Sequence, residues 1–230
     1  MNPFLLLAAL LPAGILLVRV YQLDKIEKEP PRLLLKMVLF GALGGALAAL
    51  AEILLLRFLS SRLQTDSIWF SLLKNFAVVA LIEEFCKRLP IRVIAWKDPA
   101  FDYRFDAVVY CVFSALGFAA LENAIIVAGL GIGAALSRAM LSVPGHFFFA
   151  VYMGIYLGEA KAAEREGEGF LADRYLAASL AVPVLLHGFW DFSLSSDKPV
   201  MTVVFYLFVL FFFILASLQL REAAELDTKL

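Results

Sequence analysis

The stretch VALIEEFCKRLP, Val79–Pro90, combines an apolar run with a dense group of charges. Glu83 and Glu84 stand side by side, and Lys87 and Arg88 follow within one helical turn. Glu83 and Lys87, and likewise Glu84 and Arg88, are four positions apart, so each pair is expected to meet on a helix. If this run crosses a lipid bilayer, its charges must face a bundle interior or an aqueous cavity, because charge is costly in lipid.

The composition of the chain is that of a membrane protein. Of its 230 residues, 62% are hydrophobic and 18% are charged, and the mean hydropathy is +0.85. Soluble domains carry about a quarter charged residues. A formal net charge of -1, without a basic tail or a glycine-rich phosphate loop, gives no indication of nucleic-acid binding. Partners are therefore expected in the lipid bilayer.

Apolar stretches of about 20 residues, the length that crosses the hydrocarbon core as a helix, fill nearly the whole chain. They predict an all-α, polytopic membrane helix bundle that forms a single domain over residues 1–230. Apolar character in the third stretch begins at Ile68, but Lys74 and Asn75 interrupt it, so we expect the spanning helix to start near Phe76. The seven expected spans are 4–20, 33–58, 76–96, 105–128, 138–158, 171–192 and 200–220.

Basic residues gather in the connections on one side of the predicted bundle. Since positive residues favour the cytoplasm, the N-terminus is predicted to lie outside and the C-terminus in the cytoplasm. The residues on the basic side are Arg19, Lys25, Lys28, Arg32, Lys36, Arg92, Lys97, Arg104, Lys161, Arg165, Arg174, Arg221 and Lys229.

The second span contains a pattern that permits close helix approach. Gly41 and Gly45, in the stretch GALGG, are spaced as in the GxxxG motif of membrane helices. The motif is common, so packing is its expected role.

Both histidines of the chain, His146 and His187, fall inside predicted spans, as does Glu122. Rare intramembrane ionisable residues usually face a bundle interior or an aqueous cavity. Counted at about 1.5 Å per residue, these three and Glu83 lie roughly 9 to 12 Å below the outer ends of their spans. The four are expected to share one layer, provided that the third helix starts near Phe76.

Purely structural roles are the alternative for each of these residues. The charge pairs at 83–88 could be neutralising pairs whose single role is to hold neighbouring spans together. A lone histidine on an apolar face is usually a core residue. Packing alone, however, does not require two adjacent carboxylates at this depth. A general base or a metal ligand does need a carboxylate in a dry, polar-lined pocket.

Two histidines and one carboxylate fit a metal site with an open position for water, as in catalytic zinc enzymes. The ligands would be Glu122, His146 and His187, on three different helices. Asp191 follows His187 by four residues, so it could orient the imidazole, bind the substrate backbone, or be an ordinary interfacial acid. Asp106, Asn123 and Arg138 could support the site residues, or they could serve in helix packing or capping.

Four segments carry a resemblance to a known family: EEFCK at 83–87, FDAVVYCVFSALGFAALEN at 105–123, HFFFAVYMG at 146–154 and HGFWD at 187–191. Together and in this order they resemble the PrsW-type intramembrane proteases, which are related to CAAX prenyl endopeptidases and bacteriocin-processing membrane enzymes. The segments extend over about half of the chain. Ala107 and Cys111 depart from the pattern, since glycines are expected there.

The resemblance implies a multi-helix membrane peptidase, usually classed as a metallopeptidase, that cuts membrane-anchored proteins. One role in the family is the first cut of an anti-sigma factor. Glu83 and Glu84 match the paired acids of the family and Glu122 the acid of its Phe-x-x-x-Glu motif. His146 and His187 match its two histidines.

The mechanism that we expect is peptide hydrolysis by an activated water. Glu122, His146 and His187 would bind a divalent metal, expected to be zinc, and Glu83 would act as general base. Glu84 would be a second acid or a ligand, with Lys87 and Arg88 tuning both acids through charge. A mechanism in which glutamate and histidine activate water without metal is the alternative.

Two other classes of protein also use buried histidines or glutamates. An ion-coupled transporter or proton relay would predict an internal repeat or paired broken helices, and the sequence shows neither. A haem- or lipid-binding scaffold would use His146 and His187 as axial ligands.

Overall fold

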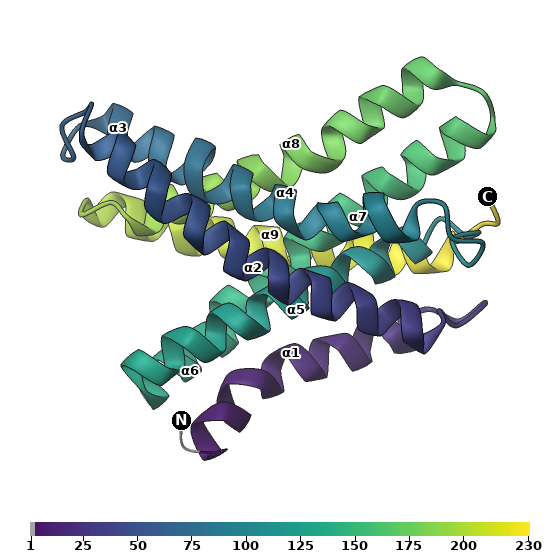
Figure 1. The fold of residues 1–230 in the computed structure, drawn as a ribbon, viewed down its shortest axis with the longest axis horizontal. Coiled ribbons are helices and arrows are strands. Elements are labelled where there is room, and N and C mark those ends of the chain that lie inside the picture. The colour runs from purple at the N-terminus through teal and green to yellow at the C-terminus, as the bar shows by residue number, and fades with distance from the viewer. Residues whose placement is uncertain (1–2) are drawn as a thin grey trace.

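The apolar runs of the chain fold into long helices, because a backbone in lipid must satisfy its own hydrogen bonds. The structure, a computed structural model, describes residues 3–230 and is a bundle of helices (Figure 1). Within this part of the chain, six helices are long and apolar enough to cross a membrane. They are α1 (Pro3–Leu23), α2 (Pro31–Ser60), α5 (Asp106–Leu130), the continuous helix Ile132–Arg165, α8 (Gly169–Leu194) and α9 (Pro199–Glu225). The predicted polytopic helical membrane bundle is confirmed.

The continuous helix Ile132–Arg165 has three parts: α6 (Ile132–Ser137), the π-helical segment η3 (Arg138–Ser142) and α7 (Val143–Arg165). It begins earlier and ends later than the predicted span 138–158. The other long helices also extend a few residues beyond the predicted spans, except that α5 begins one residue later than predicted, at Asp106. The predicted spans cover only the apolar part of each helix, whereas the hydrogen-bonded turns of the helix continue into its polar ends.

A seventh helical segment, residues 68–95, carries the charged stretch. It runs without interruption through α3 (Ile68–Leu72), η1 (Leu73–Ala80), α4 (Leu81–Pro90) and η2 (Ile91–Ala95), of which η1 and η2 are π-helical. Pro90 lacks an N–H group, and the wide turns directly follow it, with the Trp96 N–H donating to Ile91 O at 2.8 Å.

The predicted start of this helix near Phe76 is wrong. The helix begins at Ile68, because Ser67 Oγ accepts a hydrogen bond from the Phe70 N–H at 3.1 Å and caps the first turn. Asn75 does not interrupt the helix: it is buried, and its amide donates to Ser71 O at 2.9 Å and to Ser195 Oγ at 3.0 Å.

α2 and α5 cross at closely packed glycines. A Cβ atom added at Gly41 would lie 2.0 Å from Ser114 O, and one added at Gly117 would lie 2.2 Å from Val38 O. The packing role predicted for the GxxxG pattern therefore applies to Gly41. At Gly45 the nearest atom, Phe118 O, would be 3.5 Å away, which is an ordinary contact.

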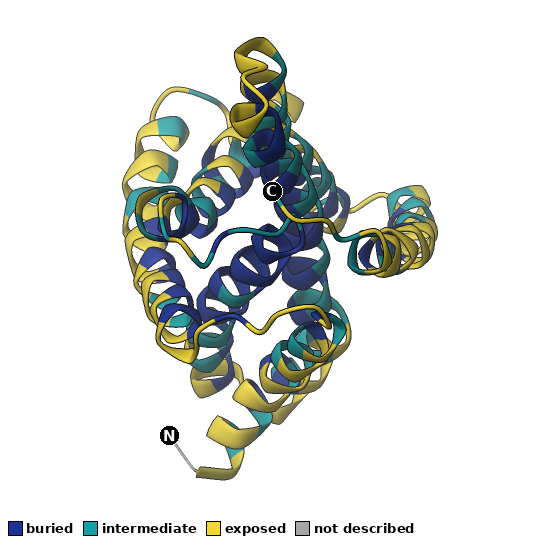
Figure 2. Cartoon of the chain, turned by 90° about the vertical axis from the view of Figure 1, so that its right-hand side faces the viewer, coloured by how far each residue is buried: buried dark blue, intermediate teal, exposed yellow. Residues whose placement is uncertain are grey.

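α5 lies in the middle of the bundle and supplies much of its buried core. In Figure 2 the dark blue buried residues fill the interior, and yellow exposed residues cover the outward faces of the helices. Many of these exposed side chains are large and apolar, as on α2 and α9, which suits contact with lipid. The described chain starts and finishes at opposite ends of the bundle (Figure 1).

Acidic groups are buried in the connection between α1 and α2, outside the membrane-spanning helices. Glu29 is 3% exposed and accepts a hydrogen bond from the Tyr110 hydroxyl. Burial, and then a hydrogen bond with Asp106, raises the pKa of Glu29 to about 9. Burial likewise raises the pKa of Asp24 to about 6. At neutral pH the connection is therefore folded around a protonated Glu29.

Replacing Gly41 by Ala should force α2 and α5 apart and lower the free energy of unfolding by roughly 1–3 kcal/mol. Gly45→Ala is the matched control, since its Cβ has room and Ala favours a helix over Gly by about 1 kcal/mol. Thermal unfolding midpoints of the purified variants in detergent check this. Equal midpoints for the two variants would show that the crossing is not closely packed.

The stability of the folded protein should fall as pH rises from about 5 to about 9. The pKa of Glu29 is raised from its usual value near 4.5 to about 9, so the folded state binds more protons than the unfolded state across this window. Glu29→Gln should flatten the decline above pH 6, where Asp24 contributes little more. Unfolding midpoints measured in detergent over this pH range test it, and a parallel decline in the variant would contradict the assignment.

Candidate active site

A buried ammonium lies at the centre of the charged stretch. Lys87 Nζ donates to Glu83 Oε2 at 3.0 Å and to Glu84 Oε1 at 2.7 Å, and lies 2.9 Å from His146 Nδ1. Its side chain has no exposed surface. A charge buried in this way is tolerated only with close partners. Lys87 therefore joins the paired acids of α4 to α7.

The expected pair of Glu84 and Arg88 is wrong. Among the described residues Glu84 pairs with Lys87 and His187, and Arg88 Nε is buried without a hydrogen-bond partner. Lys87 is three residues after Glu84 and four after Glu83, so one ammonium reaches both carboxylates on the inward face of α4. Arg88 lies one residue further round the helix and forms no ion pair with either acid.

The two histidines are held by different partners. Since an ammonium can only donate, His146 Nδ1 accepts from Lys87, and His146 Nε2 donates to Glu122 Oε2 at 3.1 Å. His187 Nδ1 lies 2.8 Å from Glu84 Oε1, whereas its Nε2 lies 3.4 Å from Asp191 Oδ2. The two rings meet edge to face with centroids 5.6 Å apart. Glu84 thus orients His187 so that Nε2 faces Asp191 and lies 4.0 Å from Glu83 Oε2.

Glu122 is fixed by a chain of polar contacts. Arg138 donates to Glu122 Oε2 from Nη2 and to Asn123 Oδ1 from Nε, each at 2.7 Å. Asn123 in turn donates to Ala9 O at 2.5 Å and connects the group to α1. Asp106 lies elsewhere: its carboxylate accepts from the N–H groups of Asp102 and Tyr103 at the start of α5.

One cavity of about 290 Å³ is lined by several of the predicted site residues, among them Glu83, Glu122, His146 and His187. Side-chain exposure is 30% for Glu122 and 9% for Glu83, whereas Glu84 is fully buried behind the wall. The cavity is lined by Glu52, Val79, Glu83, Glu122, Arg138, Ser142, His146, Phe149, His187, Trp190, Asp191 and Leu194.

Equal depth below the helix ends does not explain this convergence. Glu83 and His146 lie about four turns after the starts of their helices, but Glu122 and His187 lie about two turns before the ends of theirs. The helices therefore project unequally beyond the site. Contacts between the helices, rather than their lengths, bring the four residues together.

The donor chemistry of the site fits a divalent metal. Glu83, Glu84 and His146 offer donor atoms that all lie within 4.8 Å of one another. Carboxylates and imidazoles are the ligands that zinc takes in catalytic sites, and Glu84 Oε2 is buried without a hydrogen-bond partner. The ammonium of Lys87 already contacts all three of these residues. The set expected from the sequence, Glu122, His146 and His187, lines the open cavity and stays a prediction.

The sequence reasoning missed Glu52 of α2, which also lines the cavity. Its Oε1 atom is buried without a hydrogen-bond partner. Glu52 is the single ionisable residue between Lys36 and Arg57. The rule on intramembrane ionisable residues that selected the histidines would also have selected it.

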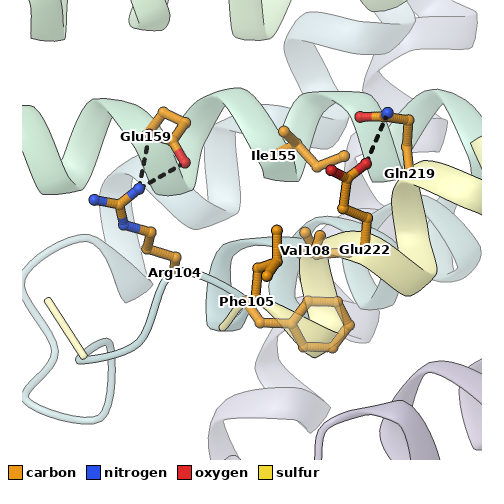
Figure 3. Close-up of a pocket in the computed structure, with 9 residues that line it drawn as sticks. Arg104, Phe105, Val108, Ile155, Glu159, Gln219 and Glu222 are labelled. Atoms are coloured by element: carbon orange, nitrogen blue, oxygen red, sulfur yellow. Dashed lines mark hydrogen bonds and ion pairs between the residues drawn. The ribbon is translucent and has the colours of Figure 1, made fainter. Parts of the chain in front are cut away.

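A second polar hollow, of about 240 Å³, lies between α5, α7 and α9 (Figure 3). There Arg104 points toward Glu159 and donates to both carboxylate oxygens at 3.0 Å, and Gln219 donates to Glu222 at 3.2 Å. None of its lining residues is a histidine. Arg104 is paired with Glu159, and the remaining acid, Glu222, accepts from Gln219, so the hollow lacks the histidines and the clustered carboxylates of the first cavity.

Carboxylates and histidines around a polar cavity inside a membrane helix bundle are the groups that a membrane-embedded hydrolase needs. Residues 29–218 match the PrsW family intramembrane metalloprotease, and the chain belongs to this family. It is thus a membrane peptidase. This membership favours hydrolysis over the transporter and scaffold alternatives.

Several curated proteases PrsW are similar to this chain. The protein of Oceanobacillus iheyensis is 32% identical over 222 residues, covering 96% of both chains. That of Geobacillus kaustophilus is 34% identical over 195 residues, covering 84% of this chain and 81% of its own. That of Bacillus subtilis is 30% identical over 199 residues, covering 84% of each. No solved structure gives a significant match.

Removing the buried cation should destabilise the fold. Lys87→Met leaves Glu83 and Glu84 without their ammonium, so we expect a loss of about 3–5 kcal/mol in the free energy of unfolding. Arg88→Met, which removes a cation without an ion pair to either acid, is the matched control and should lose much less. Denaturant unfolding in mixed micelles measures both. An equal or greater loss for Arg88→Met would contradict the central role of Lys87.

Proposed function

We propose that the protein hydrolyses a peptide bond of a membrane-anchored protein with a water molecule activated in the 290 Å³ cavity. The observation that carries the proposal is the convergence of Glu83, Glu122, His146 and His187, from different helical segments, on that cavity. Family membership supplies the reaction class.

Glu83 is the proposed general base. It lines the cavity, and Lys87 holds its carboxylate at 3.0 Å, so its position is defined without a bound substrate. Glu84 acts from behind the wall as a positioning residue, because it contacts both Lys87 and His187. Arg138 does the same for Glu122.

The cofactor that we propose is a divalent metal, with zinc as its identity. Glu122, His146 and His187 would hold it, because these donors face the cavity, whereas the donor group around Lys87 already contacts a cation. A bound metal would lower the pKa of water and polarise the scissile carbonyl. His187 presents Nε2. For His146 to bind through Nε2 as a neutral imidazole, its one proton would have to move to Nδ1, and Nδ1 would then no longer accept from Lys87, which would keep its bonds to Glu83 and Glu84. In the metal-free alternative, Glu83 and His187 activate the water.

Charge and resemblance carry the proposed orientation, domain organisation and substrate. The N-terminus would lie outside and the C-terminus in the cytoplasm, because the basic connections gather at the end of the bundle that holds the C-terminus. Residues 1–230 would act as one peptidase domain. The family resemblance suggests a membrane-anchored anti-sigma factor as substrate.

The test is cleavage of a single-span reporter protein reconstituted with the purified enzyme into vesicles. Glu83→Gln and His146→Ala should each reduce the rate by at least about 10²-fold, the scale of a lost general acid or base. Glu159→Gln, which breaks a charge pair in the second hollow, is the control and should cut at the parent rate.

Metal content measured on the same preparations separates the mechanisms. Stoichiometric zinc that is lost in Glu122→Gln but kept in Glu84→Gln supports the proposed ligands, and the reverse supports the donor group around Lys87. Activity without stoichiometric metal favours the metal-free alternative. If Glu83→Gln and His146→Ala both cut at the parent rate, the proposed function is wrong.

A further inference from the structure

A smaller cavity of about 120 Å³, different from the hollow beside Arg104, adjoins the active site between α2 and α5. The two cavities share three lining residues, all of them glutamates: Glu52, Glu83 and Glu122. The rest of the smaller cavity is apolar or small, with Gly45, Ala49, Phe118, Leu121, Ile125 and Ile126 around it. The carboxylates therefore mark the boundary between an apolar approach and the polar cavity.

The smaller cavity faces the outer surface of the bundle. α2 and α5 touch at Gly41 and Gly117, and from there their ends spread apart in Figure 1. Ala49 is exposed at this side, and Ile125 is 61% exposed. In a bilayer these residues face acyl chains, so the cavity connects the lipid side with the active site.

Glu52 stands at this boundary with an unused acceptor. The carboxylates of Glu83 and Glu122 are paired with Lys87 and Arg138, but Glu52 Oε1 is buried and has no hydrogen-bond partner. A buried acceptor without a partner costs roughly 1–3 kcal/mol. Packing of α2 does not require it, because an apolar side chain would serve there. Such an acceptor is suited to bind a hydrogen-bond donor that comes from outside the chain.

The substrate of a peptidase in this position brings such donors. A peptide bond within a membrane helix is shielded until the helix unwinds locally, and unwinding frees backbone N–H groups. In a site with little water these groups need new acceptors from the protein. A carboxylate oxygen at the entrance to the active site meets that need.

We propose that the substrate enters from the lipid between α2 and α5, and that Glu52 binds a backbone N–H of its unwound segment next to the scissile bond. This inference rests on the proposed peptidase function. Gly45 and Ala49 are small, which leaves room for a chain to pass. Glu52 is thus a substrate-binding residue, and Gly45 and Ala49 line the entry portal.

The first experiment measures KM and kcat on the single-span reporter. Glu52→Leu removes the acceptor and should raise KM about tenfold or more with a smaller change in kcat, whereas Glu52→Gln keeps an acceptor oxygen and should recover most of the affinity. Ala49→Phe should slow cleavage by filling the portal. Leu50→Phe, on the next residue and facing outward with 57% exposure, is the matched control and should not.

The second experiment locates the substrate without needing turnover. In a Glu83→Gln, Cys86→Ala, Cys111→Ala background treated with an added oxidant, Ala49→Cys should form a disulfide with a cysteine placed beside the cleavage site of the reporter, and Leu50→Cys should not. Equal crosslinking at both positions, or a parent KM in Glu52→Leu, overturns this inference alone. A parent enzyme that cuts no reporter overturns the proposed function, and this inference with it.

Discussion

The pairing of the Lys87 ammonium is the constraint on which the site depends. In a bundle interior a charge without partners is far more costly than one in water, so Glu83, Glu84 and His146 must stay within reach of Lys87. Glu84 then draws in His187, and His146 draws in Glu122. Each contact fixes the next, and α4, α5, α7 and α8 are held in one relative position. The candidate active site and the packing of these helices therefore depend on the same set of interactions.

The bundle around this cluster is closed at one place and open at another. Gly41 and Gly117 let α2 and α5 touch, backbone against backbone, and this crossing lies beside the charged face of α4, where Ser114 Oγ donates to Lys87 O at 2.6 Å. Beyond the crossing the helices diverge, and the space between them becomes cavity. One contact thus both supports the buried charges and gives the site its opening. The proposed entry of a membrane-anchored substrate would use this opening.

Much of the candidate site could be predicted from single residues. The predictions that failed did so for physical reasons. His146, His187, Glu122 and Glu83 were selected because ionisable residues are rare in apolar helices. The pairing of Glu84 with Arg88 failed because spacing along a helix shows which residues are neighbours but not which of two cations faces the interior. The predicted helix start failed because the buried Asn75 has a hydrogen-bond partner, Ser195, that lies 120 positions away in the sequence.

By itself the sequence determined that this is a helical membrane bundle with buried acids and histidines, because lipid allows few other folds for such apolar runs. The family motifs in it also determined the class of enzyme. Only the tertiary structure decided that one ammonium serves two carboxylates, that Glu84 lies behind the cavity wall, and that Glu52 reaches the cavity. These facts depend on the rotation and crossing of helices that are distant in sequence. In the stretch VALIEEFCKRLP, the charges become an ordered site only when α7 and α8 bring His146 and His187 to it.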